Sequence, residues 1–188
     1  MRPPASCISP LTGTITPVTT YDLVTEVTDH ESRAVFGVYD AVFGDQPDYE
    51  AWRGGVWDRH TARAGFRLAR AHVDGRLVGF GYGYTGEPGQ WWTDQAAEML
   101  EPEVAEAWLG GHFELVTIGV LEEARGKHVG RTLLDRLTDG LPQARWVLMT
   151  TGDADDPARH LYARAGWQVI GPGLRDGQVV MGRRRAVR

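Results

Sequence analysis

The chain has 188 residues, of which 42% are hydrophobic and 24% are charged, and its net charge at pH 7 is −5. These values are typical of one globular domain and exclude a disordered, collagen-like or coiled-coil chain. The negative charge argues against a protein held to nucleic acid by its overall field, and no apolar run approaches the roughly 18 residues that cross a membrane.

The single cysteine, Cys7, cannot form an internal disulfide. The start of the sequence, Met1–Pro4, lacks the apolar run of a signal peptide. Both features predict a cytoplasmic protein. The histidines have no spacing typical of metal ligands, so no metal site is expected. We also expect no nucleic-acid or membrane partner.

The first half of the chain predicts a leader, a strand and two helices. Residues 1–20 are rich in proline and threonine and are expected to form a flexible leader, which leaves 21–188 as a single domain. Leu23–Val27 predicts a short strand. Asp29 is the expected N-cap of the first helix, and a second helix is expected to start near Pro47.

A β-hairpin follows. Phe66–Val73 and Leu77–Tyr84 read as strands joined by Asp74-Gly75, which is a strong turn signal. One face of the second strand carries glycine at alternate positions, which lets another backbone or a ligand approach closely.

The same strand contains a formal dinucleotide-binding pattern. Gly81-Tyr82-Gly83-Tyr84-Thr85-Gly86 fits G-x-G-x-x-G, which makes an NAD-binding oxidoreductase one rival reading. That motif needs a helix directly after its glycines, whereas Glu87-Pro88-Gly89 follows here. The glycines are therefore expected to make a thin strand face.

Residues 87–111 form an insert with an unusual composition. It holds three tryptophans and six acidic residues but no lysine or arginine; these are Trp91, Trp92, Trp108, Glu87, Asp94, Glu98, Glu101, Glu103 and Glu106. A pocket of such aromatics and carboxylates would favour a cationic amine. The alternative is that the tryptophans belong to the core and the acids to solvated helix faces.

Beyond the insert, strand and helix alternate. Apolar positions spaced as on one helix face run from Val129 to Leu141. The other expected elements are strands at Phe113–Leu121, Arg145–Thr150, Trp167–Ile170 and Gln178–Met181, and a helix at Pro157–Ala165 that Asp155 or Asp156 caps. This order predicts a mixed α/β sheet in one domain.

The junction Val120–Arg131 carries the clearest chemical signal. A strand turns into a helix through a loop with Gly126 and Gly130 and three cations, namely Arg125, Lys127 and Arg131. Free amides at a helix N-terminus bind anions, and the added cations suit a pyrophosphate. A Walker A motif does not fit, because Gly126–Thr132 is one residue short and lacks the lysine.

Two motifs resemble those of the GNAT superfamily. Arg125-Gly126-Lys127-His128-Val129-Gly130-Arg131 resembles its motif A, [Arg/Gln]-x-x-Gly-x-[Gly/Ala]. About thirty residues on, Asp155-x-x-Ala158-x-x-x-Tyr162-x-x-x-Gly166-Trp167 resembles motif B. The resemblance covers residues 21–182. His128 departs from the pattern's glycine, Asp155 from its asparagine and Trp167 from its phenylalanine.

The resemblance implies a GNAT fold, with a mixed central sheet of six or seven strands, about four flanking helices, and splayed strands that form an acyl-CoA cleft. It implies an acyltransferase of class EC 2.3.1, an N-acetyltransferase that moves the acetyl group of acetyl-CoA, its co-substrate, directly to a primary amine. We expect the acceptor to be a small cationic molecule or a peptide. A catalytically silent acyl-CoA sensor is the alternative, and an exposed sheet edge is compatible with a homodimer.

The resemblance also assigns donor-binding residues. Backbone groups of Ile118, Gly119 and Val120 would pair with the pantetheine arm. The pyrophosphate would lie on the loop and helix start, which comprises Arg125, Gly126, Lys127, His128, Val129, Gly130 and Arg131. Asp155 joins the donor-binding set through its place in motif B.

Two residues are expected to carry the chemistry. In the family, the tyrosine of motif B, here Tyr162, protonates the departing thiolate; a phenol with a pKa of about 10 can do so for a thiol of about 8.5. The alternative is that its hydroxyl only hydrogen-bonds the sulfur. An ammonium must lose a proton before it attacks. Glu114 is the first candidate base, because its spacing before Val120 resembles that of the catalytic glutamate in histone-type members of the family. The alternative is that Glu114 is a solvent-side carboxylate and that an ordered water serves.

Overall fold

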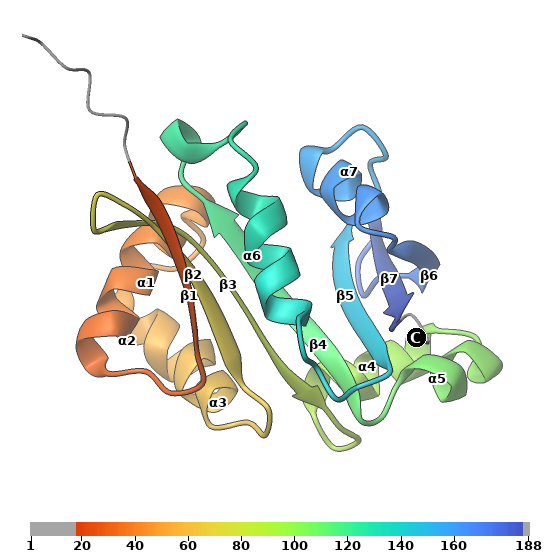
Figure 1. Ribbon diagram of the computed structural model, residues 1–188. Helices are drawn as coiled ribbons and strands as arrows, with labels where there is room; N and C mark the ends of the chain where they lie inside the picture. Colours follow the sequence, from red (N-terminus) through yellow and green to blue (C-terminus); the bar gives the residue numbers. More distant parts are fainter. Residues whose placement is uncertain (1–17, 186–188) are drawn as a thin grey trace, which may run out of the picture.

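The computed structural model describes residues 18–185, which form a seven-stranded sheet in the order β1-β2-β3-β4-β5-β7-β6 (Figure 1). In chain order the elements are β1 (Thr19–Val24), α1 (Asp29–Phe43), α2 (Tyr49–Trp52), a π-helical segment (Arg53–Trp57), α3 (Asp58–Thr61), β2 (Arg67–Val73), β3 (Arg76–Gly86), α4 (Trp91–Met99), α5 (Pro102–Trp108), β4 (His112–Val120), a 3₁₀ turn (Glu122–Ala124), α6 (Val129–Thr138), β5 (Arg145–Thr151), α7 (Pro157–Arg164), β6 (Gln168–Pro172) and β7 (Gln178–Arg184). The predicted mixed sheet of six or seven strands is confirmed.

Helices cover both faces of this sheet. On one face, α6 and α7 bury a core of leucines against β3, β4, β5 and β7. On the other face, α1–α3 pack an aromatic core on β2 and β3, and α4–α5 pack on β5, β7 and β6. Within residues 18–185, no helix is long and apolar enough to cross a membrane.

The glycine face of β3 makes room for α6. A Cβ built on Gly79 would lie 3.3 Å from Cδ1 of Leu133, and one built on Gly81 would lie 2.9 Å from Cδ1 of Leu137. Hence the glycines let the helix sit close to the strand. The run Gly81–Gly86 lies inside β3 and pairs with β4, so it does not form the phosphate loop of a dinucleotide-binding fold.

The strands β4 and β5 are parallel and part soon after they begin. They pair only at Phe113–Trp146 and Glu114–Val147. Beyond that point the two strands diverge, as Figure 1 shows toward the top of the view. We call this region, in which no main-chain pairs join β4 to β5, the β4–β5 gap. It confirms the splayed strands that were expected in the sheet.

Some predicted boundaries were wrong. β1 begins at Thr19, within the expected leader, because Thr19 and Thr20 pair with Val73 and His72 of β2. The rest of that leader, residues 1–17, lies outside the described residues.

The first helix is capped by Thr28 and not by Asp29. Thr28 accepts the amide of Glu31 at 3.2 Å, and the Glu31 carboxylate accepts the amide of Thr28 at 2.8 Å. This reciprocal capping box satisfies two donors that a cap at Asp29 would leave open. The expected second helix is broken into α2, the π-helical segment and α3, and the insert contributes two helices, so the helices exceed the expected four.

Candidate functional site

The loop between β4 and α6 turns sharply before the helix begins. Gly126 has φ +73° and His128 has φ +61°, both in the left-handed region. The first bond inside α6 joins the amide of Thr132 to the carbonyl of His128. The amides of Val129 to Arg131 therefore have no acceptor within the helix and can bind an anion.

His128 stands at the motif position where the family pattern has glycine. A left-handed conformation costs a residue with a Cβ roughly 1–2 kcal/mol, which explains why glycine suits this place. Gly130 differs, because a Cβ there would meet Cδ2 of Leu161 at 3.5 Å, an ordinary contact. Because a Cβ fits at this position, alanine can replace glycine there, as the pattern allows.

The three cations of the loop are anchored by nearby protein groups. Nε of Arg125 donates to the carbonyl of Val120 at 3.0 Å, and Nζ of Lys127 donates to that of Glu123 at 3.0 Å. Arg131 pairs with Asp135 at 2.9 Å. All three side chains remain exposed, so their charges surround the start of α6 in solvent.

The strand that leads into this loop borders the β4–β5 gap. Ile118, Gly119 and Val120 pair with β3 on one side. On the side of β5 they have no strand partner in the part of the chain that the structure describes. A Cβ on Gly119 would lie 3.1 Å from the ring of Phe80, so any larger residue here would force that ring to shift.

Glu114 is buried at the root of the gap. Only 4% of it is exposed, which excludes a solvent-side carboxylate. The hydroxyl of Tyr84 donates to Oε1 at 2.8 Å, and Oε2 has no hydrogen-bond partner among residues 18–185. Burial raises the pKa of Glu114 from 4.5 to about 7, although the Tyr84 hydrogen bond and the charge of Arg63 act to lower it.

Tyr162 lies in α7, on the other face of the sheet. Its ring is 7% exposed and packs 6.1 Å from the ring of Trp167. Burial, and then the charge of Asp156, raise the pKa of the Tyr162 phenol well above its usual value. Glu114, whose Cα partner is Val147, belongs to the opposite face. The two predicted catalytic residues therefore lie on opposite faces of the sheet.

The N-terminus of α7 is capped by Asp156, one of the two predicted alternatives. Its carboxylate accepts the amide of Ala158 at 2.7 Å. The amide of Asp155 donates to the carboxylate of Asp153 at 3.0 Å, and the side chain of Asp155 is exposed in the loop before the helix.

A cavity of about 480 Å³ lies between α3 and α4, close to Glu114. We call it the α3–α4 pocket; its lining residues are Arg59, His60, Arg63, Tyr84, Gly89, Gln90, Trp91 and Trp92. Tyr84 joins it to the carboxylate of Glu114. The sequence analysis missed Arg59, His60 and Arg63; the spacing of the two arginines, four residues apart, was the available signal.

The acids of the insert do not line this pocket. All six, from Glu87 to Glu106, are exposed on the outer surface of α4, α5 and their connections, and none is among the pocket residues. This is the arrangement of solvated helix faces. Trp108 is buried against Val147 and Val180 in the core, whereas Trp91 is 69% exposed at the pocket.

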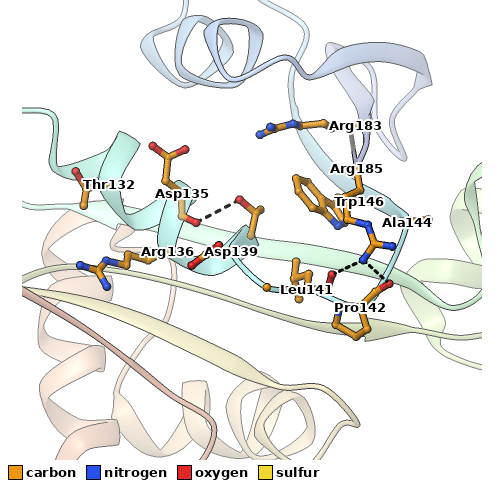
Figure 2. Close-up of a pocket in the computed structure, with 12 residues that line it drawn as sticks. Thr132, Asp135, Arg136, Asp139, Leu141, Pro142, Ala144, Trp146, Arg183 and Arg185 are labelled. Carbon is orange, nitrogen blue, oxygen red and sulfur yellow. Dashed lines mark hydrogen bonds between the residues drawn. The ribbon is translucent and has the colours of Figure 1, made fainter. Parts of the chain in front are cut away.

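A larger cavity of about 1120 Å³ lies elsewhere, between the C-terminal half of α6, the start of β5 and the end of β7 (Figure 2). Trp146 forms part of its wall, with the guanidinium of Arg183 4.9 Å from the Trp146 ring centroid. Arg185 donates to the carbonyl of Leu141 at 2.9 Å. None of the predicted site residues lines this cavity.

Comparison of the sequence with known proteins identifies relatives. A sequence model described as the acetyltransferase (GNAT) family matches residues 26–167. The GCN5-like protein acetyltransferase Rv2170 of Mycobacterium tuberculosis is 37% identical over 101 residues, which are 50% of this chain and 49% of that protein. The alignment thus spans about half the length of this curated relative.

Solved structures share the fold. The ribosomal-protein-S18-alanine N-acetyltransferase of Escherichia coli superposes with a TM-score of 0.60 at 14% identity, over 91% of this chain and 96% of that one. PaiA N-acetyltransferase of Thermoplasma acidophilum, solved in complex with coenzyme A, has a TM-score of 0.57 at 13% identity, over 88% of this chain and 99% of that one. At these identities the likeness concerns the fold alone.

Proposed function

The chain belongs to the acetyltransferase (GNAT) family, and on that premise we propose that it transfers the acetyl group of acetyl-CoA directly to a primary amine. The acceptor is the amine of a small molecule or a peptide. The single cysteine favours the cytoplasm as the place of this reaction.

The donor-binding part of the proposal is supported by the start of α6. The free amides of Val129 to Arg131 and the exposed cations of the preceding loop fit a pyrophosphate in charge and in donor chemistry. The unpaired edge of Ile118–Val120 offers backbone groups to an extended amide-bearing arm. Acetyl-CoA supplies the activated thioester.

The observation that carries the proposal is the buried carboxylate of Glu114, which lies at the last residue pair before β4 and β5 part. Tyr162 takes the role of the acid through its place in motif B, and it lies on the opposite face of the sheet. Glu114 accepts the proton of the ammonium at Oε2, and a pKa near 7 suits a general base at neutral pH. The freed nitrogen lone pair forms the N–C bond as the C–S bond breaks. Tyr162 donates its phenolic proton to the thiolate sulfur.

The raised pKa of Tyr162 is compatible with this role. It keeps the phenol protonated and ready to donate at neutral pH. The same burial that disfavours a phenolate also disfavours a thiolate beside it, so both proton affinities rise together.

The acceptor is proposed only as a primary amine. The expectation of a cationic molecule depended on the acids of the insert, which lie exposed on the outer surface of the insert and not in the pocket beside Glu114.

A thermal-shift titration tests the donor assignment. Acetyl-CoA at 100 times its Kd should stabilise the protein by about 2.7 kcal/mol, or roughly 5–10 °C for a chain of this size, whereas NADH and ATP should not. The absence of a shift at saturating acetyl-CoA would refute the proposal.

A matched pair of variants in α6 locates the effect. Arg131→Gln removes a cation from the first turn of the helix and should reduce the shift. Arg136→Gln makes the same charge change in the last turn and should leave it intact. Equal responses of the two variants would place the donor elsewhere.

A further inference from the structure

The α3–α4 pocket is positively charged, and the roles proposed so far for the site residues do not account for this charge. Two of its lining side chains are arginines, Arg59 and Arg63, and none is acidic. The ion pairs within residues 18–185 include neither arginine. Two carboxylates next to lining residues in the chain are engaged elsewhere, since Asp58 pairs with Arg53 at 3.2 Å and Asp94 accepts the amide of Gly89 at 2.9 Å.

Each guanidinium is anchored by a hydrogen bond and still has N–H groups available to bind a ligand. Arg63 donates to Oε1 of Gln90 across the pocket and lies 4.6 Å from the ring centroid of Tyr84. Arg59 donates to the carbonyl of Gly55. Each guanidinium has five N–H groups, so these contacts leave several free for a ligand. Arginines held in this way are suited to bind a carboxylate or a phosphate.

The electrostatics of the pocket disfavour a cation. The pKa of His60, which lies beside the two arginines, falls from 6.5 to about 4, first through burial and then through the charges of Arg63 and Arg59. His60 is therefore neutral at pH 7, and its Nδ1 lies 3.1 Å from the hydroxyl of Tyr82. A positive charge on a ligand would meet the same repulsion from the two arginines.

The pocket is next to the proposed base. The ring of Tyr84 lies against Arg63 on its face, and the hydroxyl of the same ring donates to Glu114 at 2.8 Å. Tyr84 thus contacts both the guanidinium and the carboxylate. A cavity of about 480 Å³ falls in the range of small-molecule sites, roughly 300–1,000 Å³.

We infer that the α3–α4 pocket binds the acceptor, and that the acceptor is a primary amine with an anionic group a few bonds from its nitrogen. Arg59 and Arg63 bind that group, which directs the amine toward Glu114. Trp91 and Trp92 supply an apolar wall for the body of the molecule. The inference rests on the proposed acetyl transfer and adds the chemical class of its acceptor.

Matched pairs of amines test this inference. Glycine, L-phenylalanine and L-glutamate are compared with glycinamide, L-phenylalaninamide and L-glutamine amide, and O-phosphoethanolamine with ethanolamine, at saturating acetyl-CoA with thiol release as the readout. The anionic member of at least one pair should have a kcat/KM at least ten-fold higher. The pairs that respond distinguish a carboxylate from a phosphate. Equal use of charged and neutral members throughout would overturn the inference.

Variants of the arginines give a second, independent readout. Arg59→Gln with Arg63→Gln should raise KM for the anionic amines about ten- to a hundred-fold, as expected for lost hydrogen bonds to a charged group, with kcat and the KM for acetyl-CoA within two-fold. Arg63→Lys should restore part of the loss. Arg136→Gln, on the opposite face, should change nothing. An unchanged preference in the double variant would overturn the inference.

Binding measurements separate this inference from the proposed function. The same acids are titrated calorimetrically into the protein loaded with CoA and into the free protein. Binding of CoA without binding of any acid overturns the acceptor class and leaves the donor assignment standing. Binding of an acid that is lost in the double variant, without binding of CoA, supports an anion pocket and refutes acetyl transfer.

Discussion

Glu114→Gln should make the protein more stable at alkaline pH and leave its stability nearly unchanged at acidic pH. In the wild type, the carboxyl is 4% exposed and its pKa rises from 4.5 to about 7 on folding. The folded state therefore holds this proton more strongly than the unfolded state does. The stability that it contributes is complete below pH 4.5 and is lost as the pH rises through 7.

The size of the effect follows from the pKa values. A rise from 4.5 to about 7 corresponds to roughly 3 kcal/mol of unfolding free energy. The amide that replaces the carboxyl in the variant has no proton to lose and can still accept the hydroxyl of Tyr84. The variant's advantage in unfolding free energy should therefore grow by about 2–3 kcal/mol between pH 5 and pH 8.

Urea unfolding of the two proteins across this pH range measures the difference. Glu106→Gln, which alters an exposed acid of the insert, is the control and should show no such trend. A difference between Glu114→Gln and wild type that stays flat with pH would refute the burial-driven pKa. The same group should appear as an acidic limb near pH 7 in the kcat/KM profile, and the variant should lack it.

Two further substitutions test the assigned roles. Tyr162→Phe should lower kcat at least 100-fold, the scale of a lost proton donor, while the Kd for CoA stays within two-fold; unchanged turnover would leave the hydroxyl with a structural role only. His128→Gly should raise the unfolding free energy by about 1 kcal/mol, seen as a Tm about 2–4 °C higher, because it relieves the left-handed φ of +61°. A lower Tm for that variant would mean that the imidazole makes a stabilising contact that outweighs the strain.

Local patterns in the sequence predicted the elements that depend on local physics. The apolar spacing from Val129 to Leu141 predicted α6, although the helix ends at Thr138 and Leu141 lies beyond it. The leucines of the pattern are buried as expected. The cap of the first helix was misplaced because Thr28 and Asp29 are both good caps, and Glu31 decides between them only through a reciprocal bond. Pro157 predicted the start of α7, since its missing amide costs nothing at the first helical position.

The candidate site also has one part that local sequence patterns predicted and one part that they did not. The strand–loop–helix junction is one continuous segment, so its motif could be seen in the sequence. The α3–α4 pocket could not, because Arg59 and Arg63 meet Gln90 and Trp92 only after the β2–β3 hairpin folds between them. The environment of Glu114 is also a tertiary property, since the hydroxyl that binds it belongs to Tyr84, thirty residues earlier in the chain.

The insert has a mechanical consequence for the proposed donor site. With two residue pairs between β4 and β5, few main-chain hydrogen bonds join the two halves of the sheet. The insert starts from β3 in one half, and its helices pack on β5, β7 and β6 in the other (Figure 1). Arg145 of β5 also donates to the carbonyl of Gly110 at its end, at 2.6 Å. The insert thus links the two halves of the sheet, and we expect its packing to influence how far apart the C-terminal halves of β4 and β5 stand.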